Sequence, residues 1–360
     1  MNILHTETLK KWGGQQNRVL QEAVGLRERG HYVVIACQKD SILADKAGKA
    51  GLKVYELNFR GKNYLMLVPK LAKIVRQENI DIVSTHSSAD SWAGGMAAGF
   101  TGTKLVRFRH NLYPMGRGLP AKLIYSMPER IIAISGAVKD VFVQHGMGNK
   151  KIAIIPDAVD TQIFNPGAED LRAELKILPE TLVIGNTSTF TEVKGQEYLL
   201  KAFNIIGRKV PCILLFAGRL MEPARSRYLS HVDPELRDKV IFLGHRDDVP
   251  GVLKTLDVFV FPSFLEGLGT ALLEAMMMEK AVTVSDIPTF RDFVEEGENG
   301  VYFKAKDFED IAEKVIALLQ NKVLRDGLGR NARATALEKF TVGKMLDLTE
   351  ACYTEVFNAV

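Results

Sequence analysis

The chain has 360 residues, of which 46% are hydrophobic and 25% are charged. This composition is that of a globular protein, and the length exceeds what one compact core usually accommodates, so we expect two domains. No stretch approaches the roughly 18 apolar residues that a membrane helix needs, and the first residues do not resemble a secretion signal. We therefore expect a cytoplasmic protein.

Charge is distributed unevenly along the chain. Up to residue 160 there are 23 lysines and arginines against 13 aspartates and glutamates, and after it 24 against 30. The basic first half predicts an anionic partner, such as a phosphorylated glycan or the headgroups on the cytoplasmic face of a membrane; an accidental imbalance of solvated charges is the alternative. We expect no nucleic acid, because the acidic second half would repel its phosphates.

Apolar runs predict strands at 33–37, 53–57, 80–85, 105–108 and 130–134. After a polar segment from Ile155 to Ala168 the pattern restarts, with runs at 182–185, 212–217, 240–243, 258–261 and 281–284. Amphipathic stretches between the runs predict helices, and this alternation is typical of α/β folds with doubly wound parallel sheets. We predict domains at 1–165 and 166–340, with a last helix at 341–360. Ligands of such sheets bind beyond the carboxyl ends of the strands, so we expect a central cleft.

The most informative segment runs from 257 to 276, where a strand, a glycine-bearing loop and a helix follow one another. Glu266 lies in the loop and can accept hydrogen bonds from sugar hydroxyls, and Glu274 on the helix can accept those of a ribose. The helix start favours a phosphate, because its amides point outward with the positive end of the dipole; these amides belong to Gly267, Leu268, Gly269 and Thr270. The alternative is that both glutamates are ordinary surface carboxylates.

The two glutamates, with Pro262 and Ser263 before them and Ala275 and Met276 after, resemble the signature of family 4 retaining glycosyltransferases of the GT-B fold. The resemblance covers nearly the whole chain, through Trp12-Gly13-Gly14, His86, His110, 132–135, Ile155-Pro156, Lys194-Gly195, 244–249 and 298–300. It implies two Rossmann-like domains, with the last helix returning to the first. It also implies transfer from a nucleotide sugar to a glycan or lipid-linked saccharide, in bacterial lipopolysaccharide or surface polysaccharide synthesis.

The resemblance also implies the roles of particular residues. Lys194 corresponds to the lysine that binds the donor diphosphate, and His110 to the histidine near the reacting sugar, so these two and Glu266 are the predicted catalytic residues. Thr189 stands where the family usually has an arginine, for which Arg219 is a candidate substitute. The remaining predicted donor-binding residues are Gly13 and Gly14, which open a helix after the first strand, and His245 and Arg246.

On the acceptor side we expect His86, Arg109 and Arg117. The last two belong to a basic loop between residues 107 and 125 that is suited to an anionic acceptor. The segment from 62 to 76 interleaves basic and apolar residues, which fits either a helix resting on a membrane surface or, more simply, core packing.

We expect no cofactor and no metal. Gly13 and Gly14 lack the third glycine of the dinucleotide fingerprint, no Asp-x-Asp pair is placed to hold a metal, and the three cysteines lack metal-ligand spacing. Glu266 and Glu274 would lie about 12 Å apart on a helix, too far for the carboxylate pair of a retaining or an inverting glycosidase, which disfavours hydrolysis. Our hypothesis is front-face transfer with retention, in which the leaving diphosphate takes the acceptor proton. Two alternatives stay open: a nucleotide-sugar epimerase or hydrolase on the same scaffold, and a non-catalytic nucleotide-sugar-binding protein.

Overall fold

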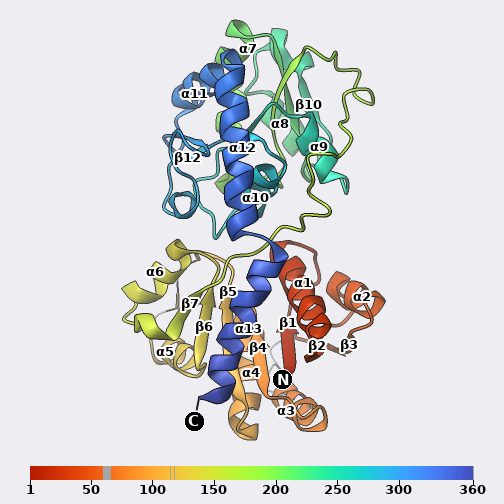
Figure 1. Ribbon diagram of the computed structural model, residues 1–360, viewed down its shortest axis with the longest axis vertical. Helices are drawn as coiled ribbons and strands as arrows, with labels where there is room; N and C mark the ends of the chain where they lie inside the picture. The colour runs from red at the N-terminus through yellow and green to blue at the C-terminus, as the bar shows by residue number, and fades with distance from the viewer. Residues whose placement is uncertain (60–65, 114, 117, 360) are drawn as a thin grey trace. The chain divides into compact units, whose positions relative to one another are not determined.

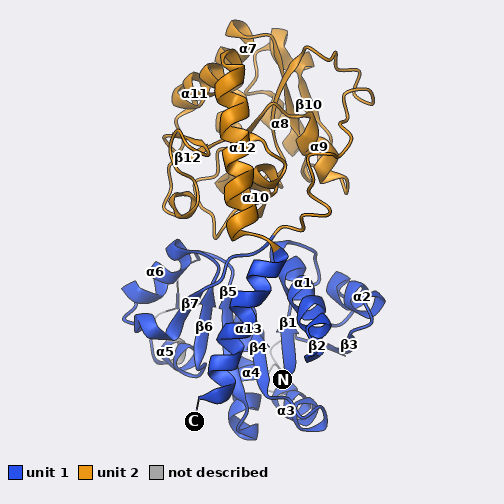
Figure 2. Ribbon diagram, in the orientation of Figure 1, with its two compact units in different colours: residues 1–158, 342–360 blue, residues 159–341 orange. Residues whose placement is uncertain are grey.

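A computed structural model describes residues 1–59, 66–113, 115–116 and 118–359. The chain forms two compact units, unit 1 with residues Met1–Ala158 and Val342–Val360, and unit 2 with Val159–Thr341 (Figure 2). The first crossing between the units lies within the polar segment from Ile155 to Ala168, where the strand pattern pauses. None of the helices in the described ranges is long and apolar enough to cross a membrane.

Unit 1 contains one parallel sheet of seven strands, in the order β3-β2-β1-β4-β5-β6-β7. The strands are β1 (Asn2–Glu7), β2 (Tyr32–Gln38), β3 (Lys53–Leu57), β4 (Ile82–Thr85), β5 (Lys104–Arg109), β6 (Arg130–Ala133) and β7 (Ile152–Ile154). All five strands predicted for this half are present. The predicted ranges omit β1, whose second half is polar although it is buried, and β7, which is too short to form an apolar run.

Helices cover both faces of this sheet (Figure 1). They are α1 (Gly14–Glu28), α2 (Ile42–Lys49), α3 (Leu67–Gln77), α4 (Ser88–Thr101), α5 (Leu119–Ser126), α6 (Gly136–Gln144) and α13 (Val342–Asn358). One core lies under α1, α2 and α13, and the other lies under α3 and α4. The C-terminal helix α13 packs on α1 so closely that a Cβ atom at Gly25 would lie 2.3 Å from Leu346 Cδ1.

Unit 2 contains a second parallel sheet, in the order β10-β9-β8-β11-β12-β13. Its strands are β8 (Leu182–Asn186), β9 (Cys212–Phe216), β10 (Val240–Phe242), β11 (Val258–Phe261), β12 (Ala281–Ser285) and β13 (Val301–Phe303). Its helices are α7 (Gln196–Lys209), α8 (Ala224–Leu229), α9 (Val249–Thr255), α10 (Thr270–Met277), α11 (Phe308–Gln320) and α12 (Lys322–Lys339). The five strands predicted for this half are confirmed.

The loops that follow the strands of unit 2 hydrogen-bond to one another at the carboxyl edge of the sheet. The Gly218 amide donates to the Gly244 carbonyl at 2.7 Å, and the Phe190 amide donates to the Arg219 carbonyl at 3.4 Å. These bonds join the loops after β8, β9 and β10, so residues far apart in sequence meet along one edge.

Candidate active site

Lys194 and Glu266 meet at the carboxyl edge of the unit 2 sheet. Lys194 ends a single 3₁₀ turn after β8, and Glu266 lies in the loop after β11. Lys194 Nζ donates to Glu266 Oε1 and lies 5.4 Å from the centre of the Phe261 ring. The Glu266 side chain is almost fully buried, and Thr289 Oγ1 donates to its backbone carbonyl at 2.7 Å. The structure therefore brings two of the three predicted catalytic residues into direct contact.

The glycine after Lys194 allows this contact. Gly195 has a φ of +68°, and a Cβ atom there would lie 2.1 Å from the carbonyl oxygen of Pro262. The Phe264 amide also donates to the Val193 carbonyl at 3.0 Å. A residue with a side chain at 195 would push the two loops apart, so the Lys194 loop needs glycine here.

The start of α10 lies beside this pair. Gly269 precedes the helix with a φ of +92°, and a Cβ there would lie 2.9 Å from Phe261 Cε1. No acidic side chain lies in the first turn of α10. The positive end of this helix is therefore not compensated from within the helix, which suits it to an anionic ligand.

Glu274 lies further along α10. Its carboxyl group is mostly buried and makes no hydrogen bond or ion pair with the part of the chain that the structure describes. Burial raises the pKa of Glu274 to about 8, so most molecules carry it protonated at pH 7. A buried carboxyl group without partners is available to accept hydrogen bonds from the hydroxyl groups of a ligand.

Several polar atoms near this edge of unit 2 were missed by the sequence analysis. Gln196 Nε2 donates to Ser188 Oγ at 3.1 Å and so braces the loop after β8. Within the described ranges, Thr187 Oγ1, Ser263 Oγ and Gln196 Oε1 are buried and have no hydrogen-bond partner. The signal for the two hydroxyl groups was a hydroxyl side chain one or two residues after the end of a buried strand, at 187 and at 263.

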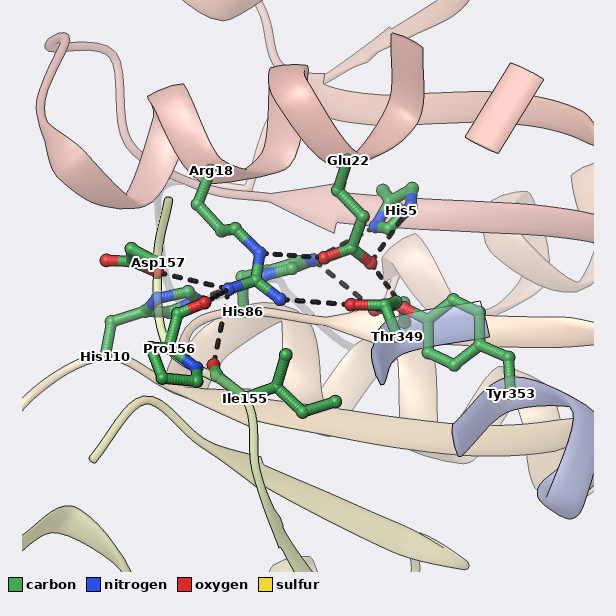
Figure 3. A network of polar contacts seen from close by, with 11 residues as sticks. His5, Arg18, Glu22, His86, His110, Ile155, Pro156, Asp157, Thr349 and Tyr353 are labelled. Atoms are coloured by element: carbon green, nitrogen blue, oxygen red, sulfur yellow. Dashed lines mark hydrogen bonds and ion pairs between the residues drawn. The ribbon is translucent and has the colours of Figure 1, made fainter. Parts of the chain in front are cut away.

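In unit 1, three histidines form a hydrogen-bonded chain across neighbouring strands (Figure 3). His5 lies on β1, His86 follows β4 and His110 follows β5. His5 Nδ1 lies 3.1 Å from His86 Nε2, and His86 Nδ1 lies 3.1 Å from His110 Nε2. Burial lowers the pKa of His5, lowers that of His86 well below its usual value, and lowers that of His110 to about 3. The three rings are therefore neutral near pH 7.

A buried ion pair closes the other end of this chain. Arg18 Nε donates to Glu22 Oε2 at 2.9 Å, and Glu22 Oε1 accepts from Tyr353 Oη at 2.8 Å. The Arg18 guanidinium also donates to the Pro156 carbonyl at 2.7 Å and to Thr349 Oγ1 at 3.2 Å. The sequence analysis missed this network, for which the spacing of Arg18 and Glu22 by four residues was the available signal.

The predicted start of a helix at the two glycines is confirmed. The helix α1 begins at Gly14, with Gly13 before it, and both glycines are exposed. The segment that leads to them is held by Glu7, whose Oε1 accepts from the Thr8 amide at 2.7 Å and whose Oε2 accepts from Gln15 Nε2 at 2.6 Å. Burial raises the pKa of Glu7 to about 7.

Comparison with known proteins agrees with this geometry. The family described as Glycosyltransferase Family 4 matches residues 12–163, and the family described as Glycosyl transferases group 1 matches residues 168–335. The two matches together span most of both units. This chain is a glycosyltransferase, with a family 4 first half and a group 1 second half.

Curated relatives of this glycosyltransferase include two bacterial enzymes. The UDP-Gal:alpha-D-GlcNAc-diphosphoundecaprenol alpha-1,3-galactosyltransferase of Escherichia coli is 25% identical over 99% of this chain and 97% of its own length. The N,N'-diacetylbacillosaminyl-diphospho-undecaprenol alpha-1,3-N-acetylgalactosaminyltransferase of Campylobacter jejuni is 25% identical over 87% and 88%.

Solved structures show that the glycosyltransferase has the GT-B fold. A glycosyltransferase from Rickettsia africae superposes with a TM-score of 0.91 at 20% identity and covers all of both chains. Anabaena Alr3699/HepE in complex with UDP superposes with a TM-score of 0.86 at 21% identity, over 99% of this chain and all of the other.

The other residues predicted to bind the donor lie on the loops at the same edge of unit 2. Thr189 and Arg219 are exposed, and the Arg219 guanidinium has no partner in the described ranges. His245 is exposed, with Nε2 3.6 Å from Asp247. Arg246 instead forms ion pairs with Glu174 at 2.9 Å and Asp248 at 2.6 Å, so these carboxylates already occupy its guanidinium.

The residues predicted for the acceptor side have different surroundings. His86 is the middle ring of the histidine chain. Arg109 is buried and donates to Tyr125 Oη at 3.0 Å and to the Asn111 carbonyl at 3.1 Å, so it braces its own loop. Arg117 lies outside the described residues. Of the basic amphipathic segment, residues 62–65 also lie outside them. Leu67 is buried in the core, as the simpler interpretation expects, whereas Met66 is 66% exposed.

Proposed function

We propose that this glycosyltransferase moves a sugar from a UDP-sugar to a saccharide linked through diphosphate to a polyprenol lipid, in bacterial lipopolysaccharide or surface polysaccharide synthesis. The contact between Lys194 and Glu266 beside the uncompensated start of α10 is the observation that carries this proposal. The named substrates of the Escherichia coli and Campylobacter jejuni relatives support the acceptor class, and the complex of Alr3699/HepE with UDP supports the nucleotide.

In this proposal each group in unit 2 has a distinct task. Lys194 and the first amides of α10 bind the diphosphate, because both present positive charge at one place. Glu266 accepts hydrogen bonds from hydroxyl groups of the transferred sugar. Glu274 accepts hydrogen bonds from the two ribose hydroxyls, for which its carboxyl oxygens have free lone pairs.

We further propose that transfer proceeds on one face of the sugar with retention of the anomeric configuration. The bond from the anomeric carbon to the phosphate oxygen breaks as the bond to the acceptor oxygen forms, and the acceptor proton passes to a phosphate oxygen. Lys194 and the helix amides stabilise the charge that develops on the leaving diphosphate. Because these groups supply that stabilisation, the reaction is proposed to need no metal.

Contact with the cytoplasmic face of the membrane is also part of the proposal. The helix α5 exposes Leu119 by 80% and Leu123 by 51%, four residues apart on one side, with the exposed Lys122 between them. Apolar residues beside a basic one suit the boundary of an anionic bilayer. Sedimentation with anionic and with neutral vesicles tests this: wild type should pellet with anionic vesicles, and Leu119→Ser/Leu123→Ser should stay in the supernatant.

The deciding experiment incubates the purified protein with UDP-galactose, UDP-N-acetylglucosamine or UDP-N-acetylgalactosamine and a GlcNAc-diphosphoundecaprenol acceptor. We expect a longer lipid-linked saccharide with an α-anomeric signal by NMR, formed equally in excess chelator. A β product would refute retention, and loss of activity in chelator would refute the metal-independent proposal. Release of UDP that is no faster with acceptor than without it would favour a hydrolase or epimerase, and donor binding without turnover would favour a binding protein.

A further inference from the structure

The histidine chain of unit 1 has two chemically different ends (Figure 3). At one end, His5 Nε2 is buried 3.8 Å from the carboxylate oxygen Glu22 Oε1, which is beyond hydrogen-bond distance but close enough for a strong electrostatic interaction. At the other, His110 Nδ1 is buried and has no hydrogen-bond partner in the described part of the chain. Between these ends the rings are joined nitrogen to nitrogen, so the state of one ring constrains the next.

Each ring carries one proton, because burial keeps all three histidines neutral. A hydrogen bond between two neutral imidazoles needs one N–H and one bare nitrogen. The tautomers of the three rings are therefore linked, and only two arrangements satisfy both bonds. In one, every N–H points toward Glu22 and His110 Nδ1 is bare; in the other, every N–H points away and His110 Nδ1 carries a proton.

Glu22 decides between these arrangements. Its carboxylate can only accept hydrogen bonds, so an N–H of His5 facing it is favoured and a lone pair facing it is repelled. With the proton on His5 Nε2, His86 Nε2 donates to His5 Nδ1, and His110 Nε2 donates to His86 Nδ1. The nitrogen left bare is His110 Nδ1.

A second route from His86 to Glu22 leads to the same arrangement. Ser84 Oγ lies 3.3 Å from His86 Nε2 and 3.0 Å from Tyr353 Oη. The only proton of Tyr353 points to Glu22 Oε1, so Ser84 donates to Tyr353 and accepts from His86. Both routes place a proton on His86 Nε2.

We propose that Glu22 is a positioning residue that acts through His5 and His86 to keep His110 in the tautomer with a bare Nδ1, which accepts a hydrogen bond from a substrate hydroxyl. The part that concerns substrate rests on the proposed function. The tautomer itself does not, since it follows from the contacts inside unit 1.

Replacing one carboxylate oxygen of Glu22 by an NH₂ group should reverse the direction of every hydrogen bond in the histidine chain. In Glu22→Gln the Arg18 guanidinium, which can only donate, retains the amide oxygen at the position of Oε2. The NH₂ group then occupies the position of Oε1 and faces His5 Nε2. His5 must present a lone pair to this donor, so every proton in the chain moves to the opposite nitrogen, and His110 Nδ1 becomes protonated.

Nitrogen-15 NMR of histidine-labelled protein reads these tautomers directly, because protonated and bare ring nitrogens have well separated shifts. The chain contains seven histidines, and the signals that disappear in His110→Asn identify those of His110. We expect wild-type His110 to carry its proton on Nε2, and Glu22→Gln to carry it on Nδ1. Tyr353→Phe, which leaves the carboxylate in place, should retain the wild-type tautomer.

Wild type with a proton on His110 Nδ1 would overturn the proposal, and this measurement needs only the His110→Asn variant, for assignment. An unchanged His110 tautomer in folded Glu22→Gln would also overturn it. For activity we expect Glu22→Gln to lower kcat of transfer about tenfold or more, with KM for the donor unchanged, and unchanged transfer would overturn the assigned role.

Hydrolysis of the donor without acceptor identifies which substrate supplies the hydroxyl. If hydrolysis and transfer fall together, the hydroxyl belongs to the donor sugar; if only transfer falls, it belongs to the acceptor. Absence of transfer in wild type would refute the proposed function, while the NMR result would still decide the role of Glu22.

Discussion

Lys194 Nζ donates to Glu266 Oε1, although 72 residues separate them in sequence. The loop after β8 supplies the cation, and the loop after β11 supplies the carboxylate. Their contact depends on Gly195, which lets the first loop pass directly over the Pro262 carbonyl. In the proposed reaction the diphosphate and the sugar bind where these two charges meet.

Removing the positive charge of Lys194 should lower the rate of sugar transfer far more than it lowers the stability of the fold. In Lys194→Gln the charge on the leaving diphosphate loses a stabilising partner, and charge-assisted hydrogen bonds contribute roughly 1.5 to 3 kcal/mol. We therefore expect kcat/KM to fall about tenfold to a hundredfold in steady-state kinetics. Lys201→Gln is the matched control, since it removes a partly exposed lysine that pairs with Glu197 on α7. Equal kinetics for the two variants would contradict the assigned role of Lys194.

Donor binding should release a proton near pH 7. Free Glu274 has a pKa of about 8 and is mostly protonated, whereas two bound ribose hydroxyls favour the carboxylate. Calorimetric titration with UDP-sugar in two buffers of different ionisation enthalpy should show close to one proton released. In Glu274→Gln the apparent binding enthalpy should no longer depend on the buffer. A buffer-independent enthalpy in wild type would argue against Glu274 as the ribose ligand.

The raised pKa of Glu274 also predicts how stability depends on pH. Between pH 4.5 and about 8 the folded protein holds a proton on Glu274 that the unfolded chain has released. The free energy of unfolding should therefore fall as pH rises through this range. Thermal melts of Glu274→Gln should show a gain over wild type at pH 8.5 that is larger than the gain at pH 5. A constant difference would mean that Glu274 titrates near its usual pKa.

The need for glycine at 195 can be tested by comparing Gly195→Ala with the same substitution at a glycine that has open space around it. Gly195→Ala combines an unfavourable φ with a clash against Pro262, whereas Gly297→Ala has the unfavourable φ of +75° but open space around it. We expect Gly297→Ala to lower the free energy of unfolding by about 1 kcal/mol and Gly195→Ala by roughly 1 to 3 kcal/mol more. Denaturant titration measures both, and only Gly195→Ala should also weaken donor binding.

Arg18 on α1 and Arg29, the residue directly after α1, both reach α13 and should differ strongly in their contribution to stability. Arg18 is buried and pairs with Glu22, and Arg29 is partly exposed and pairs with Asp347 and Glu350. Arg18→Ala leaves a buried carboxylate without its cation and should cost roughly 3 to 5 kcal/mol. Arg29→Ala should cost about 0 to 1 kcal/mol for each pair lost. Chemical denaturation distinguishes the two, and similar costs would contradict the burial argument.

The features that the sequence by itself determined are local. Apolar runs located ten of the thirteen strands in the described part of the chain, and the glycine loop from 266 to 269 indicated a ligand site at the start of α10. The periodicity of buried side chains is a property of neighbouring residues, so it can be recognised without knowing the sheet order. The same analysis missed the short strands β7 and β13 and the polar end of β1, because none of these segments forms a long apolar run.

The tertiary structure decided which side chains touch. His5, His86 and His110 meet because β1, β4 and β5 are neighbours in the sheet, and Tyr353 reaches Glu22 because α13 returns to α1 from the far end of the chain. Strand order and helix packing come from burying apolar faces over hundreds of residues, which no short stretch encodes. The tautomer proposed for His110 depends on such contacts, and above all on a carboxylate 88 residues earlier in the chain.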